Sequence, residues 1–465
     1  GAKLNVSHTA SLAGEDRLYE ALFDRVGVAR AHTVPQFLET LKFVSTVGAL
    51  PANTVGSMSC SGGEASLVAD AAEAVGLDMP PLSEESGKGL FQVLGPKVPL
   101  SNPLDYHTYI WGDYEKLTEC FSTMLGNGYA CTILVIDYPT PKGADTSSWQ
   151  VSERALARAI GQTGERAVIV SSIPETIPES ARIRLQAAGI TPMQGIEDCL
   201  FAIRAAATIG AAQSRAGATR PVLKPAAPNG DASSLDEWES KKELAGFGLA
   251  VPEGRRCDAA GTVAAAVELG FPVVLKAVSR ELAHKSEAGA VAVNLSDADA
   301  VAAATARMAQ QFDEFLVERM AAPVVVELII GVNRDPDFGL TLLVGAGGTL
   351  VELVDDTSSL LLPADEADIR AAIGSLRVAK LIHSFRGAAA GDLEATIAAV
   401  RIIADYAVSM NDRLIELDVN PLIVMPDGAV AVDAFIRRIG VGSGSEWGRS
   451  GVGVGSDPGF REKSR

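Results

Sequence analysis

Short apolar runs alternate with helix-like segments through the first half of the chain. Strands are predicted over segments 55–60, 131–137 and 167–171, of which the second is the clearest apolar run, and each has the length of a buried strand. A helical pattern over 64–75 follows the first run and ends at a glycine. Because strands that alternate with helices form parallel sheets covered on both faces, we expect a doubly wound α/β domain over residues 51–212.

The second half contains a strand that ends on a basic residue. The apolar run 271–275 leads into Lys276, and a turn of small residues ends at Gly289. This arrangement is suited to phosphate, because the ammonium neutralises the anion and small residues let backbone N–H groups approach it. His284 lies inside the turn, and imidazole can accept a phosphoryl group near neutral pH. For this stretch alone, a strand-end lysine with an ordinary turn histidine is an equal alternative.

Acidic residues recur at alternating positions near the end of the chain. A strand predicted over 414–421 places Glu416, Asp418 and Asn420 on one face, because side chains alternate along a strand. The next strand follows a Pro-Asp-Gly turn and ends on Asp433. An oxygen-rich cluster of this kind suits magnesium that carries nucleotide phosphates.

Composition and charge exclude several function classes. The chain has 465 residues, 47% of them hydrophobic, which is enough for about three domains. Its net charge of −18 argues against nucleic acid or an anionic membrane as the main partner. No apolar run reaches the roughly 18 residues of a membrane span, no signal peptide is visible, and the five cysteines form no CxxC pair. We expect a reduced, cytoplasmic protein.

Six segments of the second half, in family order, resemble the ATP-grasp half of NDP-forming acyl-CoA synthetases. They read VVLK, HKSEAG, VERM, ELIIGVNRDPDFG, GAGGTLVEL and ELDVNP. The resemblance implies ATP and Mg²⁺ as cofactors, with ATP held by Lys276, Gly289, Glu352 and the main chain at Glu318 and Met320, and magnesium held by Asn420 and Asp433 with Glu416 and Asp418 nearby. For Glu352, a simple surface acid is the alternative.

The N-terminal segment SHTASLAG resembles the SHTGxLAG segment of the same family and, more distantly, the phosphohistidine loop of succinyl-CoA synthetase. The resemblance implies that His8 is phosphorylated and passes its phosphate to the acid. The alternative is a helix-capping loop with an incidental histidine. Ala10 stands where the family usually has glycine, and alanine resists positive φ, so this residue departs from the family pattern at a position that bears on the mobility or geometry of the loop.

The turn Ser61-Gly62-Gly63 precedes a helix, whose free N–H groups and dipole form an anion site. It resembles the helix of succinyl-CoA synthetase that cradles the phosphohistidine, although a plain tight βα turn is the alternative. The aromatic and polar loop 106–113 follows an Asn-Pro-Leu-Asp turn and is predicted to face a site. His107 in this loop is either a lining residue or a structural one.

The resemblance also divides the chain into domains. They are a C-terminal remnant of a flavodoxin-like ligase domain with the phosphohistidine loop (1–50), a flavodoxin-like ligase-type domain (51–212), a linker rich in Ala, Pro, Gly and Ser (213–234), an ATP-grasp domain (235–440) and a disordered low-complexity tail (441–465). From the resemblance we expect the CoA-binding domain that precedes the His8 segment in the family to be missing from this chain. We therefore expect a truncated chain or a partner subunit that supplies this domain, and a homo-oligomer.

The implied activity is that of an acid–thiol ligase. It converts a small carboxylic acid, CoA as a substrate and ATP into acyl-CoA, ADP and phosphate through phosphohistidine and an acyl phosphate. Two alternatives remain. One is a regulatory or acyltransferase-related protein that senses ATP or CoA without catalysis. The other is an ATP-grasp ligase that joins a carboxylate to an amine, although such a ligase does not need the SHT loop or the flavodoxin-like half.

Overall fold

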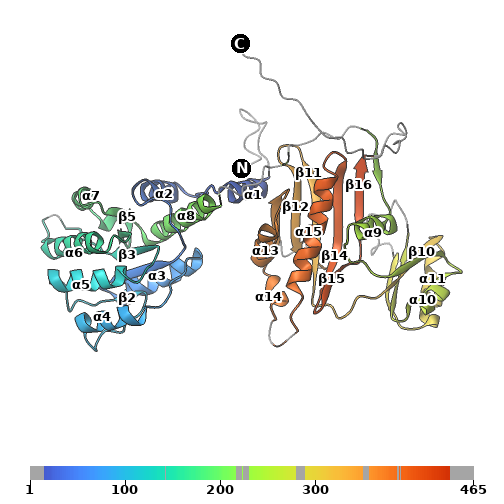
Figure 1. Cartoon of the computed structure of the whole chain (residues 1–465), viewed down its shortest axis with the longest axis horizontal. Helices are drawn as coiled ribbons and strands as arrows, with labels where there is room; N and C mark the ends of the chain where they lie inside the picture. Colours follow the sequence, from blue (N-terminus) through green and yellow to red (C-terminus); the bar gives the residue numbers. More distant parts are fainter. Residues whose placement is uncertain are drawn as a thin grey trace, which may run out of the picture. The chain divides into compact units, whose positions relative to one another are not determined.

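The chain folds into two compact units, Gly1–Pro221 and Val222–Arg465 (Figure 1). The structure is a computed structural model, and it describes residues 15–141, 143–215, 223, 230–278, 289–348, 356–384, 387 and 389–439. His8, His284 and Glu352 lie outside these described residues. Within the described part, no helix is long and apolar enough to cross a membrane.

The first unit contains a five-stranded parallel sheet (Figure 1). Its strands are β1 (Val55–Ser59), β2 (Leu104–Asp105), β3 (Cys131–Val135), β4 (Ala167–Ser171) and β5 (Thr191–Gln194). Its helices are α1 (Asp16–Val26), α2 (Val34–Thr46), α3 (Gly62–Ala74), α4 (Glu84–Leu94), α5 (Tyr114–Leu125), α6 (Ser147–Thr163), η1 (Pro174–Thr176), α7 (Glu179–Ala187) and α8 (Ile196–Ser214). The strand order β2-β1-β3-β4-β5 is the flavodoxin-like order, which confirms the predicted fold class for this unit.

Helices cover both faces of this sheet. Neighbouring residues of a strand point to opposite faces, so Leu134 packs in a core with residues of α4 to α7, whereas Ile133 packs in a second core with residues of α2, α3 and α8. Phe43 of α2 and Leu50 belong to the second core, together with Val55 of β1. The division predicted at residue 50 therefore runs through one hydrophobic core.

Two polar side chains bind strand backbone in this unit. The Asn102 amide donates to the Val55 carbonyl at 3.0 Å and accepts from the Ser57 N–H at 3.1 Å. The buried Glu39 carboxylate of α2 accepts from the Gln194 N–H of β5 at 3.0 Å. Both contacts join segments that are distant in sequence.

The second unit contains two antiparallel sheets (Figure 1). The smaller sheet, in the order β7-β10-β8-β9, is formed by β7 (Gly254–Asp258), β8 (Val273–Ala277), β9 (Val291–Leu295) and β10 (Glu314–Arg319). The larger sheet, in the order β13-β12-β11-β14-β16-β6 with β15 paired to β14, is formed by β6 (Ala232–Ser234), β11 (Val326–Asp335), β12 (Gly339–Ala346), β13 (Thr357–Leu361), β14 (Leu414–Met425), β15 (Gly428–Ala431) and β16 (Phe435–Ile439). The helices are α9 (Glu237–Gly246), α10 (Thr262–Leu269), α11 (Ala298–Met308), α13 (Glu366–Ser375), α14 (Ala379–Ile382) and α15 (Leu393–Ser409).

The bounds of several of these elements follow from local sequence motifs. Helix α9 begins after Asp236, whose carboxylate accepts from the Glu239 N–H while the Glu239 side chain accepts from the Asp236 N–H, a capping box. Strands β14 and β15 form the hairpin expected around the Pro-Asp-Gly turn. The predicted linker 213–234 is shorter in the structure, because its last three residues form β6 and pair with β16.

Candidate functional site

Lys276 lies in β8 with its ammonium group buried among oxygen atoms. Its Nζ atom is 2.7 Å from Glu237 Oε1, 2.5 Å from the Val432 carbonyl oxygen and 3.1 Å from Glu318 Oε2. The sequence predicts that Lys276 ends this strand, whereas β8 continues to Ala277 and Lys276 is its last residue but one. In this structure protein carboxylates and a carbonyl occupy the positions around the charge that a phosphate would otherwise take.

A second lysine shares these carboxylates. Lys241 of α9 donates to Glu237 Oε1 at 2.7 Å and also to Glu318. We call Lys241, Lys276, Glu237 and Glu318 the buried ion cluster; it holds two charges of each sign. Burial and the nearby Lys276 lower the pKa of Lys241. Burial also lowers the pKa of Lys276, but attraction by Glu237, Glu318 and Asp433 outweighs this and raises it.

The acidic residues of β14 lie near Asp433, which follows β15. Buried and partly exposed positions alternate along β14 around Glu416 and Asp418, in agreement with the predicted alternation, and Asn420 is exposed. Burial and the charges of Asp433 and Glu416 raise the pKa of Asp418 to about 6. The carboxylates are therefore close enough to repel one another, a situation that a bound cation would relieve.

The acids do not form a complete metal site of their own. Among the described residues, no three or more His, Cys, Asp or Glu side chains are arranged to hold a metal ion. Magnesium usually takes one or two carboxylates and completes its shell with water and substrate phosphates. The arrangement therefore fits a metal that arrives with a nucleotide.

Other predicted nucleotide contacts occupy the same unit. The Glu318 side chain belongs to the buried ion cluster, and the Met320 N–H donates to the Pro272 carbonyl at 3.2 Å, so the predicted contact of Met320 with adenine rests on its carbonyl. Gly289 is exposed and has φ of 68°, the left-handed conformation that favours glycine at the end of a turn. Glu352 and His284 lie outside the described residues.

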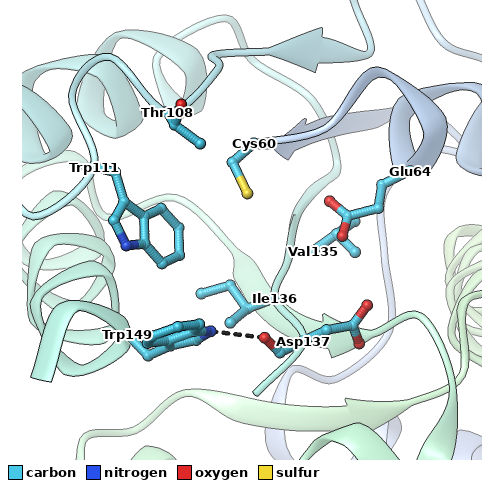
Figure 2. Close-up of a pocket in the computed structure, with 8 residues that line it drawn as sticks. All are labelled: Cys60, Glu64, Thr108, Trp111, Val135, Ile136, Asp137 and Trp149. Atoms are coloured by element: carbon cyan, nitrogen blue, oxygen red, sulfur yellow. Dashed lines mark hydrogen bonds between the residues drawn. The ribbon is translucent and has the colours of Figure 1, made fainter. Parts of the chain in front are cut away.

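A cavity of about 270 Å³ lies at the carboxyl ends of β1 and β3 (Figure 2). We call it the switch-point cavity, because the strand order of the first unit reverses between these strands, where open α/β sheets bind ligands. The lining residues are Cys60, Glu64, Thr108, Trp111, Val135, Ile136, Asp137 and Trp149. Figure 2 shows the Cys60 sulfur and the Trp111 ring turned toward the same space.

Carboxyl groups lie at one side of this cavity. Burial and the charges of Asp137 and Asp105 raise the pKa of Glu64 to about 7, and its buried Oε2 atom has no hydrogen-bond partner among the described residues. Asp137 accepts from the Ser172 N–H at 2.9 Å, from the Ser172 hydroxyl at 2.5 Å and from the Thr176 hydroxyl. Hydrogen-bond donors of Ser172 and Thr176 thus stabilise the Asp137 carboxylate, whereas Glu64 takes up a proton near neutral pH.

Replacing Glu64 with glutamine should remove a pH dependence of stability. The folded-state pKa is about 7 and the ordinary value is 4.5, so the free energy of unfolding of the wild type falls as pH rises between them. Because Glu64 is only partly buried, we expect Glu64→Gln to stabilise the protein by only about 1 kcal/mol at pH 8 relative to pH 4. Urea unfolding at both pH values measures this, with the exposed Glu73→Gln of the same helix as control. A difference from wild type that is equal at both pH values would contradict the assignment.

The structure also locates the other residues predicted in this unit. Helix α3 starts at Gly62, and the Ser61 side chain makes no capping bond to it. A Cβ atom on Gly62 would lie 3.3 Å from Asp105 Oδ2, so an acid competes with any anion at this helix start, and the anion site at Ser61, Gly62 and Gly63 stays a prediction. In the loop 106–113, Thr108 and Trp111 line the cavity as expected for a site-facing loop, but His107 does not; its N–H donates to Asp105.

Cys60 and Trp149 were not among the residues predicted from the sequence. The sequence predicts Cys60 only as the end of a strand, and Trp149 lies in a helix 38 residues after Trp111 in a segment without a motif. The aromatic loop, the predicted strand ends and the helix start after Ser61 were the signals for this site.

Comparisons with known proteins agree with these observations. Residues 226–437 match the family described as ATP-grasp domain. The chain is 27% identical to a trans-feruloyl-CoA synthase of an unknown prokaryotic organism (92% of this chain, 62% of the relative) and 26% identical to acetate–CoA ligase [ADP-forming] I of Archaeoglobus fulgidus (93% and 64%). It is 30% identical to the beta subunit of acetate–CoA ligase [ADP-forming] I of Pyrococcus furiosus, over 43% of this chain and 90% of that subunit.

The chain thus spans a little under two thirds of the length of the single-chain relatives and nearly the whole of the beta subunit. The ATP-grasp match covers the half of the chain that holds Lys276 and the acids of β14. The remaining half has the flavodoxin-like sheet. The chain belongs to the family of ADP-forming acyl-CoA synthetases.

Proposed function

We propose that the chain is the ATP-using part of an acid–CoA ligase that converts a carboxylic acid, CoA and ATP into acyl-CoA, ADP and phosphate. The observation that carries this proposal is that the Lys276 ammonium donates to the carbonyl of Val432, the residue before Asp433, and that the charge of Asp433 raises the pKa of both Lys276 and Asp418. A cation for phosphate and oxygens for metal therefore lie in one region. The names of the relatives, which are ADP-forming ligases of acetate and a synthase of feruloyl-CoA, support it.

In this proposal, ATP binds in the second unit and Mg²⁺ accompanies its phosphates. Asp433 and Asn420 would hold the metal, and Glu416 and Asp418 would adjust the charge around it. The metal would neutralise charge on the β- and γ-phosphates, while Lys276 would bind a phosphate oxygen. For Lys276 to do so, it must exchange at least one of its present partners, Glu237 or the Val432 carbonyl.

The phosphoryl group would then move through two histidines. A nitrogen of His284 attacks the γ-phosphorus and ADP leaves; His8 takes the phosphoryl group from His284; and a carboxylate oxygen of the acid takes it from His8, which forms an acyl phosphate. The thiol sulfur of CoA attacks the acyl carbon, and phosphate leaves. Because the chain matches less than two thirds of the single-chain relatives, CoA would be bound by a further domain or by a partner subunit, as the existence of a separate beta subunit suggests.

Labelling with ATP that carries a radioactive γ-phosphate tests this function. We expect the chain with Mg²⁺ to form a phosphoprotein that is labile in acid and stable in base, as phosphohistidine is. His284→Ala should abolish the label, and His8→Ala should leave it on His284. His383→Ala, a described histidine near the end of α14 that is part of no proposed site, is the matched control.

Two results would contradict the proposal. If the wild type takes up no label while Mg-ATP binds, the chain is a nucleotide sensor and not a ligase. If His284→Ala labels His8 at the normal rate, phosphate reaches His8 directly from ATP.

A further inference from the structure

The switch-point cavity has a wider and more aromatic lining than a two-carbon acid requires. We propose that this cavity binds the body of the carboxylic acid substrate and selects acids that carry a planar aromatic ring. The inference rests on the proposed function, since it names the substrate class of the same reaction. The volume of the switch-point cavity, about 270 Å³, is close to roughly 300 Å³, the lower end for pockets that enclose small organic ligands.

The tryptophans give the cavity its shape. The rings of Trp111 and Trp149 meet edge to face, with centroids 5.4 Å apart and planes at 84°. Trp149 is fixed in place because its Nε1 donates to the Asp137 carbonyl at 2.7 Å. Together with Ile136 and Cys60 they form an apolar wall, and a ring placed against it would gain aromatic contacts as well as burial.

The rim of the cavity can accept the polar end of an acid. Glu64 has a buried oxygen atom without a hydrogen-bond partner in the described structure. Its raised pKa lets it be protonated near neutral pH, and the protonated carboxyl group can donate a hydrogen bond to a substrate carboxylate. The charge of Asp137 is already compensated by Ser172 and Thr176, so it repels an anion less than an isolated carboxylate would. One acid can therefore place its carboxylate at the rim, near Glu64, and its ring inside the cavity.

Ligand-observed NMR titration of the full chain with trans-cinnamate, acetate and 2-phenylethylamine tests the proposal. Cinnamate should bind about tenfold or more tightly than acetate, because only cinnamate buries a ring. Trp111→Ala should weaken cinnamate binding about tenfold by removing one wall. Cys60→Phe should fill the cavity and block cinnamate, which provides a second variant if Trp111→Ala does not fold. Tyr109 belongs to the same loop and is 65% exposed, so Tyr109→Ala is the matched control and should bind cinnamate like the wild type.

The outcomes separate this inference from the proposed function. If cinnamate and acetate bind equally, or if Cys60→Phe binds cinnamate as the wild type does, the inference is wrong. The inference is also wrong if 2-phenylethylamine binds more tightly than cinnamate, because Glu64 and Asp137 would then make the cavity a site for cations. Mg-ATP binding and phosphohistidine formation are measured on the same samples. Their loss contradicts the proposed function, whereas their presence without cinnamate binding contradicts only the aromatic substrate.

Discussion

Replacing Lys276 with methionine is expected to weaken binding of Mg-ATP by roughly tenfold to a hundredfold, because hydrogen bonds to charged groups contribute about 1.5–3 kcal/mol. Methionine retains the aliphatic volume in the apolar environment of β8 but has no ammonium group to neutralise a phosphate. Isothermal titration calorimetry on the full chain with Mg-ATP measures the effect. Lys242→Met removes a lysine whose side chain is exposed on α9 and serves as the control for the loss of one positive charge.

Lys276 is also a member of the buried ion cluster, so the measurement must separate binding from folding. The titration should be performed at a temperature at which the unfolding curves show both variants to be fully folded. Equal affinity of Lys276→Met and the wild type under that condition would show that Lys276 only balances Glu237 and Glu318, and the phosphate-binding assignment would then be wrong.

Replacing Lys241 with methionine is expected to lower the free energy of unfolding of the second unit by about 3–5 kcal/mol, the usual cost of breaking a buried ion pair by removing one partner. Glu237 and Glu318 would then share Lys276 alone, and one buried carboxylate would lack a counter-charge. Urea unfolding, followed by far-ultraviolet circular dichroism, measures the loss. The neighbouring Lys242→Met should change stability by less than about 0.5 kcal/mol, because its side chain is exposed.

A double variant tests whether charge balance is the cause. Lys241→Met combined with Glu318→Met removes one charge of each sign, so it should be more stable than the sum of the two single effects predicts. Purely additive losses would show that each side chain contributes through packing, and the electrostatic account of the cluster would be contradicted.

Elements with local signals could be predicted from the sequence. The buried runs of the first unit and the helix after Ser61 depend on residues next to one another, and β4 agrees with its predicted bounds, Ala167–Ser171. The hairpin of β14 and β15 follows from two apolar strands around a Pro-Asp-Gly turn. The family order of motifs then added the ATP-grasp domain, which the comparisons confirm.

Contacts between distant residues could not be predicted in this way. Lys276 reaches Glu237, 39 positions earlier, and the Val432 carbonyl, 156 positions later, and no local pattern encodes either pairing. The switch-point cavity likewise requires Cys60, after β1, and Trp149, in α6, to line the same space. Such sites depend on tertiary packing, which the hydrophobic periodicity along the chain does not predict.

The complete burial of β1, β3 and β4 has a consequence for the strand register of the first unit. Every residue of β1, β3 and β4 is buried, so these strands lack the alternation of buried and exposed positions that makes a one-residue slip costly in a half-exposed sheet. Asn102 and Glu39 each recognise particular backbone groups, at Ser57 and Gln194 respectively. These two polar side chains therefore help to specify a single strand register. The apolar core stabilises the sheet but does not by itself distinguish one register from another.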